Sequence, residues 1–211
     1  LPQNRVKLEK KDIFTLVICG FTGIMLYAVL QNIAMQWISA SSANLIIASY
    51  PIITLLLESV IYKTKLSALK IVAILIAIVG VVILSYVKAE ARVEGELAGI
   101  LLLVIAGVGW AVYNFMTKKV VNRYPPITFQ FYSTLFGTIM MLPLALLERA
   151  QWKAPTVMSF SMMMFLGVFC SVIAYLLYNR GLKTMAPSSV TSMLNLMPIL
   201  GVFFSWVLLG E

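Results

Sequence analysis

The sequence predicts an all-α polytopic membrane protein with seven transmembrane helices. Of its 211 residues, 61% are apolar and only 11% are charged, whereas charged residues make up about a quarter of an ordinary soluble domain. The apolar residues form long runs, such as LSALKIVAILIAIVGVVIL, that do not alternate with polar ones. Only helices and closed barrels satisfy backbone amides in lipid, and a barrel strand needs that alternation. Helices are therefore the expected spanning elements.

Seven apolar segments can each cross about 30 Å of hydrocarbon, a distance that takes roughly 20 helical residues. They are Ile13–Trp37, Ser42–Tyr62, Ser67–Tyr86, Glu96–Thr117, Ile127–Leu147, Ser159–Leu182 and Pro187–Leu209. Polar and charged stretches separate them and are the expected connections.

The Lys and Arg residues predict the orientation of these helices. Connections on one side of the predicted membrane hold twelve cations, and connections on the other side hold four. Cytoplasmic connections carry the excess of Lys and Arg, so residues 1–11 are expected to be cytoplasmic in a plasma or inner membrane. The net charge of +8 does not indicate nucleic-acid binding, because the cations are spread between apolar runs instead of forming one patch.

Several kinds of chemistry have no support in the residues. The chain has no histidine, and both cysteines, Cys19 and Cys170, lie inside apolar runs, where packing is their ordinary role. No GxxxxGK[ST] motif for ATP occurs, and no nucleophiles or paired carboxylates converge. We therefore expect no catalytic residue, no metal site and no cofactor, and we do not expect an enzyme.

The chain contains an internal repeat with a period of 147 residues. Without a gap, this shift aligns Gly20 with Gly167 and Asn32 with Asn179, and it also superposes two Ser-Ser pairs and two Pro-Ile pairs. In the predicted topology the two copies cross the membrane in opposite directions. Inverted repeats are typical of secondary transporters, whose halves move around a central site.

The stretch AGVGWAVYNFMTKK, the SSxxxxxxxxPI pattern in both copies and the terminal LLGE resemble the EamA family of the drug/metabolite transporter superfamily. The resemblance implies a ten-helix fold of two inverted five-helix repeats. Residues 12–86 would then hold helices three to five of the first repeat, and residues 96–211 helices one to four of the second. The first two helices and the last would lie outside this sequence, so the 211-residue piece by itself is not expected to transport.

One difference between the copies limits what the resemblance implies. The second copy ends in Gly210-Glu211, the usual break before the fifth helix of the family, but the first copy has Lys63-Thr64 at that place. No role of the glutamate is therefore transferred to the first copy.

Polar residues inside the apolar segments are candidate substrate contacts, because a lipid-facing helix surface would not carry them. The candidates are Asn32, Asn44, Pro51, Trp110, Tyr113, Asn114, Tyr175, Asn179, Asn195 and Pro198. Alternatives stay open: the asparagines can link helices by hydrogen bonds, the aromatic residues can pack in the core, and proline is common in membrane helices. The two prolines are expected to kink their helices and form a pocket or hinge. Glu58 is a candidate for proton or cation coupling, with pairing to a loop lysine as the alternative.

These observations favour a secondary transporter, an exporter of a small organic metabolite that works by alternating access. A seven-helix membrane receptor or a membrane-embedded enzyme is the alternative function. A retinal protein would need a buried lysine for its Schiff base, and Pro187–Leu209 contains none. The expected partners are a small-molecule substrate and the lipid bilayer, with a homodimer as an option and no nucleic acid.

Overall fold

A computed structural model describes residues 8–38, 40–63, 68, 71–72, 76, 79 and 95–196, without the side chains of residues 40, 41, 44, 45 and 151. Within these ranges every regular element is a helix and no strand occurs, which confirms the all-α class. The predicted segment Ser67–Tyr86 falls almost entirely outside these ranges, as does the last segment beyond residue 196.

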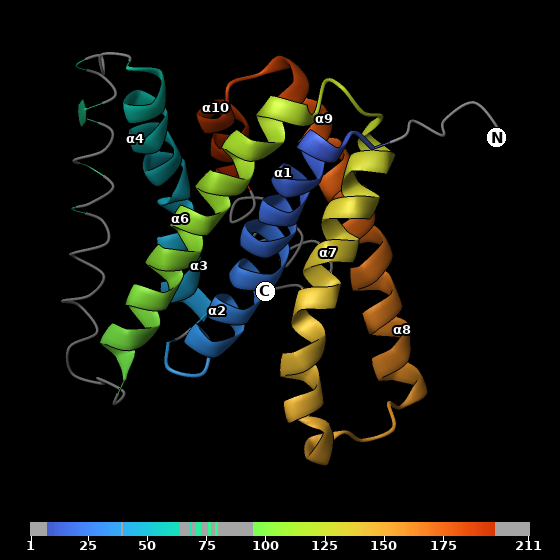
Figure 1. Cartoon of the computed structure of the whole chain (residues 1–211). Helices are drawn as coiled ribbons and strands as arrows, with labels where there is room; N and C mark the ends of the chain where they lie inside the picture. Colours follow the sequence, from blue (N-terminus) through green and yellow to red (C-terminus); the bar gives the residue numbers. More distant parts are fainter. Residues whose placement is uncertain are drawn as a thin grey trace. The chain divides into compact units, whose positions relative to one another are not determined.

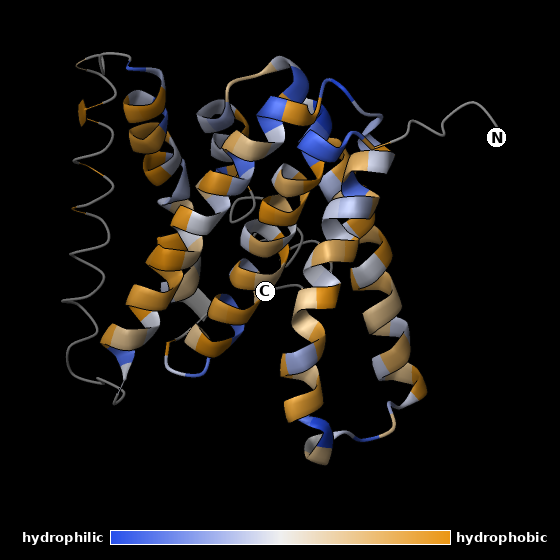
Figure 2. Cartoon of the chain, in the orientation of Figure 1, coloured by the Kyte–Doolittle hydropathy of each residue, from blue (hydrophilic) through white to orange (hydrophobic). Residues whose placement is uncertain are grey.

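In the described part of the chain, four helical stretches are long and apolar enough to cross a membrane: Lys10–Ala34, Glu96–Val120, Pro126–Leu147 and Val157–Thr184. Their ends differ from the predicted segments by no more than three residues. Figure 2 shows apolar residues along these helices and hydrophilic residues gathered at their ends. The chain is therefore a multi-pass membrane protein, and the total of seven spanning helices stays a prediction.

Two of these stretches contain a π-helix, which the sequence patterns did not predict. The first consists of α1 (Lys10–Gly20), the π-helix η2 (Phe21–Leu26) and α2 (Tyr27–Ala34). The fourth consists of α8 (Val157–Phe165), the π-helix η5 (Leu166–Ile173) and α9 (Ala174–Thr184). A π-helix contains i→i+5 hydrogen bonds, is rare, and often marks a functional position.

Three boundaries of these elements coincide under the 147-residue shift, and the others differ. It carries the first residue of α1, Lys10, onto the first residue of α8, Val157, and the last residue of η2, Leu26, onto the last residue of η5, Ile173. It also carries Ala40, where α3 (Ala40–Ala48) begins, onto Pro187, where α10 (Pro187–Ser192) begins.

The segment Ser42–Tyr62 forms two helices, α3 and α4 (Tyr50–Tyr62), instead of one kinked helix. Between them, Ser49 donates hydrogen bonds to the carbonyl of Ile46 from its backbone N–H, at 3.0 Å, and from its hydroxyl, at 2.6 Å. Pro51 falls in the first turn of α4, where its missing N–H would have no helical partner in any case. In the second copy, α10 changes into the 3₁₀ helix η6 (Met193–Asn195) just before Pro198. Pro198 itself lies outside the described residues.

The chain divides into two compact units. Unit 1 comprises residues 1–26 and 112–185, and unit 2 comprises residues 27–111 and 186–211. The helix α6 (Glu96–Val120) contributes to both. The first boundary between the units, at residues 26 and 27, falls at the end of η2.

In unit 1, α1 and η2 pack along α7 (Pro126–Leu147), and α9 packs on the same helix (Figure 1). The crossing of α1 and α7 needs small residues, because a Cβ added to Gly20 would lie 2.6 Å from the Ser133 carbonyl oxygen and 2.7 Å from the Gly137 nitrogen. Small residues let membrane helices approach closely.

In unit 2, α4 packs against α10 and lies close to α6. A Cβ added to Gly107 of α6 would come within 2.8 Å of the Tyr50 ring, and one added to Gly99 would come within 2.8 Å of the Ile38 side chain. These two glycines are close-packing points of α6, as expected from their positions in an apolar segment.

Candidate functional site

A chain of buried side-chain hydrogen bonds joins α6, α9 and α7 inside unit 1. The Tyr113 hydroxyl donates to Asn179 Oδ1 at 2.9 Å, and Asn179 Nδ2 donates to Gln130 Oε1 at 2.7 Å. Gln130 Nε2 then donates to the Thr134 hydroxyl at 2.9 Å. Tyr113 and Asn179 are fully buried, and Gln130 is 6% exposed. A buried polar group without a partner is costly. These hydrogen bonds therefore fix the orientations of side chains on three helices.

The π-helix η2 touches this chain. A Cβ added to Gly23 would lie 2.3 Å from the Tyr113 ring, so only glycine leaves room for the ring. The Tyr175 hydroxyl donates to the Gly23 carbonyl at 3.0 Å. The rings of Tyr113 and Tyr175 meet edge to face, with centroids 6.1 Å apart, which is an arrangement that aromatic pairs prefer. The Cys19 Sγ atom of α1 also lies 3.8 Å from the Thr117 hydroxyl oxygen of α6.

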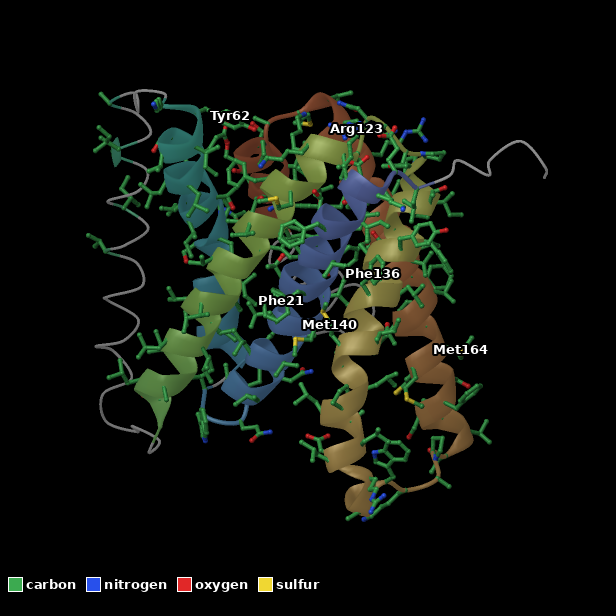
Figure 3. The ribbon with its side chains drawn as sticks, viewed as in Figure 1. Phe21, Tyr62, Arg123, Phe136, Met140 and Met164 are labelled. Carbon is green, nitrogen blue, oxygen red and sulfur yellow. The ribbon has the colours of Figure 1, made fainter. Side chains whose placement is uncertain are left out.

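Charged residues tie the helix ends of unit 1 together on one side. The Asp12 carboxylate is buried, and it accepts from Arg123 Nη1 at 2.5 Å and from the Tyr124 hydroxyl at 2.7 Å; Figure 3 labels Arg123 at this end. Burial raises the pKa of Tyr124 above its usual range, so the hydroxyl keeps its proton at neutral pH and remains a donor. Lys118 donates to the carbonyls of Leu182 and Met185 at the end of α9, which a cation stabilises.

These contacts show that α1 and α9 run in opposite directions within unit 1. Asp12, at the start of α1, and Lys183, at the end of α9, both bind the turn that contains Tyr124. Gly23, further along the first span, contacts Tyr175, near the start of α9. The 147-residue shift matches the span that begins with α1 to the span that ends with α9.

In unit 2 the predicted residue Trp110 belongs to an aromatic cluster. The ring of Tyr27 lies between those of Trp110 and Tyr50, with centroids 5.1 Å and 6.4 Å apart. Trp110 and Tyr50 are 6% and 1% exposed, and the Tyr50 hydroxyl donates to the Leu103 carbonyl at 3.0 Å. The cluster connects α2, α4 and α6 through large aromatic rings.

Glu58 contacts the backbone of α10 and not a lysine in the described part of the chain. Its Oε2 accepts from the N–H of Ser188 at 3.2 Å, in the first turn of α10. A carboxylate there satisfies an N–H that has no helical partner and complements the helix dipole. The contact provides a structural role for Glu58, and proton or cation coupling stays a prediction.

The remaining predicted substrate contacts differ in their exposure. Asn32 on α2 and Asn195 on η6 are exposed, and Pro51 is buried beside the aromatic cluster residue Tyr50. Asn114 is buried in α6. The side chain of Asn44 and all of Pro198 lie outside the described residues. Asn179 links helices in this structure, which was the alternative to direct substrate contact.

Sequence reasoning missed three residues at these positions. Gln130 is an amide inside an apolar segment, and its spacing to Ser133, Thr134 and Gly137 marks one polar, small-residue face of α7. That face was a usable signal. Tyr27 and Tyr50 lie inside the predicted segments Ile13–Trp37 and Ser42–Tyr62, and the pattern along one helix did not show that their rings would pack together. Among the described residues, no group of three His, Cys, Asp or Glu side chains forms a metal site.

Comparisons with known proteins agree with the membrane helices. The model of the EamA-like transporter family matches residues 1–86 and 97–211. The chain is 26% identical to YetK, an uncharacterized transporter of Bacillus subtilis, over 97% of this chain and 63% of that protein. It is 25% identical to an uncharacterized transporter of Clostridium kluyveri, over 99% of this chain and 68% of that protein.

A third relative has a more specific name. The probable terminal-alkyne amino-acid exporter of Streptantibioticus cattleyicolor is 26% identical, over 95% of this chain and 67% of that protein. The chain thus spans about two-thirds of the length of these curated relatives. No solved structure matches it. Because the family model covers nearly all of its residues, the chain belongs to the EamA-like transporter family.

Proposed function

We propose that the chain forms part of a secondary transporter that exports a small organic metabolite across the plasma membrane by alternating access. The observation that carries this proposal is the coincidence of three helix boundaries under the 147-residue shift, including the last residue of each π-helix. Together with the opposite directions of α1 and α9, it supports two inverted copies of one module. Such copies can exchange conformations around a central substrate, opening it first to one side and then to the other.

The two segments matched by the family model, residues 1–86 and 97–211, support a division into repeats at 12–86 and 96–211. The π-helices supply a mechanical element for the transport cycle. An i→i+5 turn can revert to an α-helical turn with a change in helix direction. The boundary between units 1 and 2 at residues 26 and 27 falls where η2 ends. This position favours η2 as a hinge.

The proposed substrate contacts are Trp110, Tyr113, Asn114, Tyr175, Asn179 and Pro51. Further candidates are Asn32, Asn44, Asn195 and Pro198. Aromatic rings with amide and hydroxyl groups suit an organic solute that has both apolar and polar parts. One relative is named as an exporter of an amino acid, a class with both features. Energy coupling is proposed to use an ion gradient.

The test compares metabolites in the medium of cells that carry or lack the complete gene that contains this sequence. We expect at least one small organic compound to accumulate outside only the cells that carry it. Trp110→Ala and Asn179→Ala should lower its export rate at unchanged protein level, whereas Lys153→Gln in an exposed connection should not. Identical metabolite profiles with and without the gene, across growth conditions, would rule out export as the function.

A further inference from the structure

The end of unit 1 at which α1 begins carries a large excess of positive charge. The start of α1, the end of α6, the turn after it and the end of α9 meet there, joined by the contacts of Asp12, Lys118 and Lys183. Seven cations lie on these four pieces against two carboxylates, Glu9 and Asp12. The cations are Lys10, Lys11, Lys118, Lys119, Arg123, Arg180 and Lys183.

Both carboxylates already have cationic partners. Asp12 pairs with Arg123, and Glu9 pairs with Lys11. Lys118 is bound by backbone carbonyls of α9. Lys119 and Arg180 are exposed, and in the described part of the chain neither takes part in an ion pair. Their charges are therefore available to a ligand from outside the protein.

The opposite end of unit 1 lacks this excess. The connection between α7 and α8 holds two cations, Arg149 and Lys153, and one carboxylate, Glu148. All three side chains are exposed. The two ends thus differ in net charge, and they provide a comparison within one unit.

An exposed apolar face leads up to Arg180. The stretch from Val157 to Ala174 has no buried residue, and Phe165, Phe169 and Leu177 are 57%, 53% and 66% exposed. Phe165 and Phe169 stack with centroids 5.0 Å apart. Leu177 precedes Arg180 by three residues, so the two share a face of α9. Because α9 ends at Thr184, within four residues of Arg180, the guanidinium lies close to headgroup level.

We propose that this end of unit 1 binds an anionic phospholipid. The phosphate is held by Arg180 and Lys119, and an acyl chain lies along the exposed face of α8, η5 and α9. A guanidinium binds phosphate through two parallel hydrogen bonds, and cations at the membrane surface attract anionic headgroups within about a Debye length. A soluble phosphate would use the same cations, but it would gain nothing from the apolar face beneath them.

Native mass spectrometry of the purified 211-residue chain in mixed micelles tests this proposal. The probes are phosphatidylglycerol and phosphatidylcholine at equal mole fraction. We expect the chain to bind phosphatidylglycerol in preference to phosphatidylcholine. In the Lys119→Gln/Arg180→Gln variant, the ratio of bound phosphatidylglycerol to bound phosphatidylcholine should fall about fivefold at low salt. The control variant Arg149→Gln/Lys153→Gln should change it by less than about twofold, because that end has little net charge.

A conservative variant separates charge loss from misfolding. Lys119→Arg/Arg180→Lys should keep most of the retention, with the same circular dichroism as the unmodified chain. Glycerol phosphate, which has the headgroup without acyl chains, should fail to displace the lipid. An equal loss of bound phosphatidylglycerol in both glutamine variants would overturn the proposal. Displacement of the lipid by glycerol phosphate would also overturn it, and so would dimers whose contact excludes lipid from this face.

Discussion

Units 1 and 2 are stabilised by different kinds of contact. In unit 1, side chains bind side chains: Tyr113, Asn179 and Gln130 form one buried chain, and Asp12 pairs with Arg123. In unit 2, aromatic rings pack around Tyr27, and the hydrogen bonds of Tyr50 and Glu58 end on backbone atoms. The polar contacts of unit 1 have fixed directions, whereas ring packing tolerates small displacements.

This difference bears on the transport cycle proposed above. A fully satisfied polar network in low dielectric specifies one arrangement of its helices, so we expect unit 1 to keep its shape through the cycle. Unit 2 contains the break at Ser49 and the adaptable ring cluster, so we expect its helices to rearrange more. Substitutions in each unit test this contrast, beginning with the largest expected effect.

The largest effect is expected for Gly23→Leu in the π-helix of unit 1. The new side chain would overlap the Tyr113 ring, since even a Cβ would lie 2.3 Å from it, and overpacking of this kind costs about 3 kcal/mol. Thermal unfolding of the purified chain in detergent measures the loss. The matched control is Gly167→Leu in η5, where an added Cβ meets nothing within 4 Å. Equal destabilisation by both would refute close packing at Gly23.

The second effect concerns the buried carboxylate of unit 1. Asp12→Asn removes the ion pair with Arg123, half of whose side chain is exposed, and weakens the bond from Tyr124. We expect about 2 kcal/mol of destabilisation, because hydrogen bonds to charged groups are worth that much. Glu9→Gln breaks an exposed pair with Lys11 and should cost much less, because solvent screens exposed ion pairs. Unfolding of both variants in one detergent compares them, and a larger loss for Glu9→Gln would contradict the assignment.

A third experiment asks whether the polar chain acts as a unit. Tyr113→Phe and Gln130→Leu remove its members on either side of Asn179. Buried hydrogen bonds between membrane helices are worth about 0.6 to 1.7 kcal/mol, and we expect a double-mutant coupling energy of about 1 kcal/mol. Additive effects would mean that Asn179 binds its two neighbours independently.

The smallest effect is expected in unit 2. Tyr50→Phe keeps the ring packed against Tyr27 and Gly107 and removes the bond to the Leu103 carbonyl. We expect a loss of about 0.5 kcal/mol, measured by the same unfolding assay. A loss larger than that of Gln130→Leu would show that unit 2 depends on directed hydrogen bonds as much as unit 1 does.

Features imposed by the lipid environment were predictable from the sequence. Lipid forces long apolar runs into helices, so Glu96–Val120 and Pro126–Leu147 were placed to within three residues. Amides inside such runs must bind protein, which marked Asn179 in advance. Gln130 carried the same signal and was overlooked. Which faces of different helices meet is decided by packing, however, and the pattern along one helix does not contain it.

The π-helices also escaped prediction for a physical reason. Their sequences, FTGIML and LGVFCSVI, share no local pattern that separates them from ordinary helix. The bond from Tyr175 to the Gly23 carbonyl comes from a residue 152 positions away. The break at Ser49 was partly predicted, since Pro51 marked the region, but a serine that caps the preceding turn moved the break upstream.

The inversion of the two copies can be tested most directly at Glu9 and Thr156, which the 147-residue shift makes equivalent and which directly precede α1 and α8. Each residue is changed to cysteine in a Cys19→Ala/Cys170→Ala background and labelled with a membrane-impermeant maleimide, before and after cells are permeabilised. The account predicts labelling of Thr156→Cys in intact cells and of Glu9→Cys only after permeabilisation. Labelling of both cysteines from the same side would contradict it.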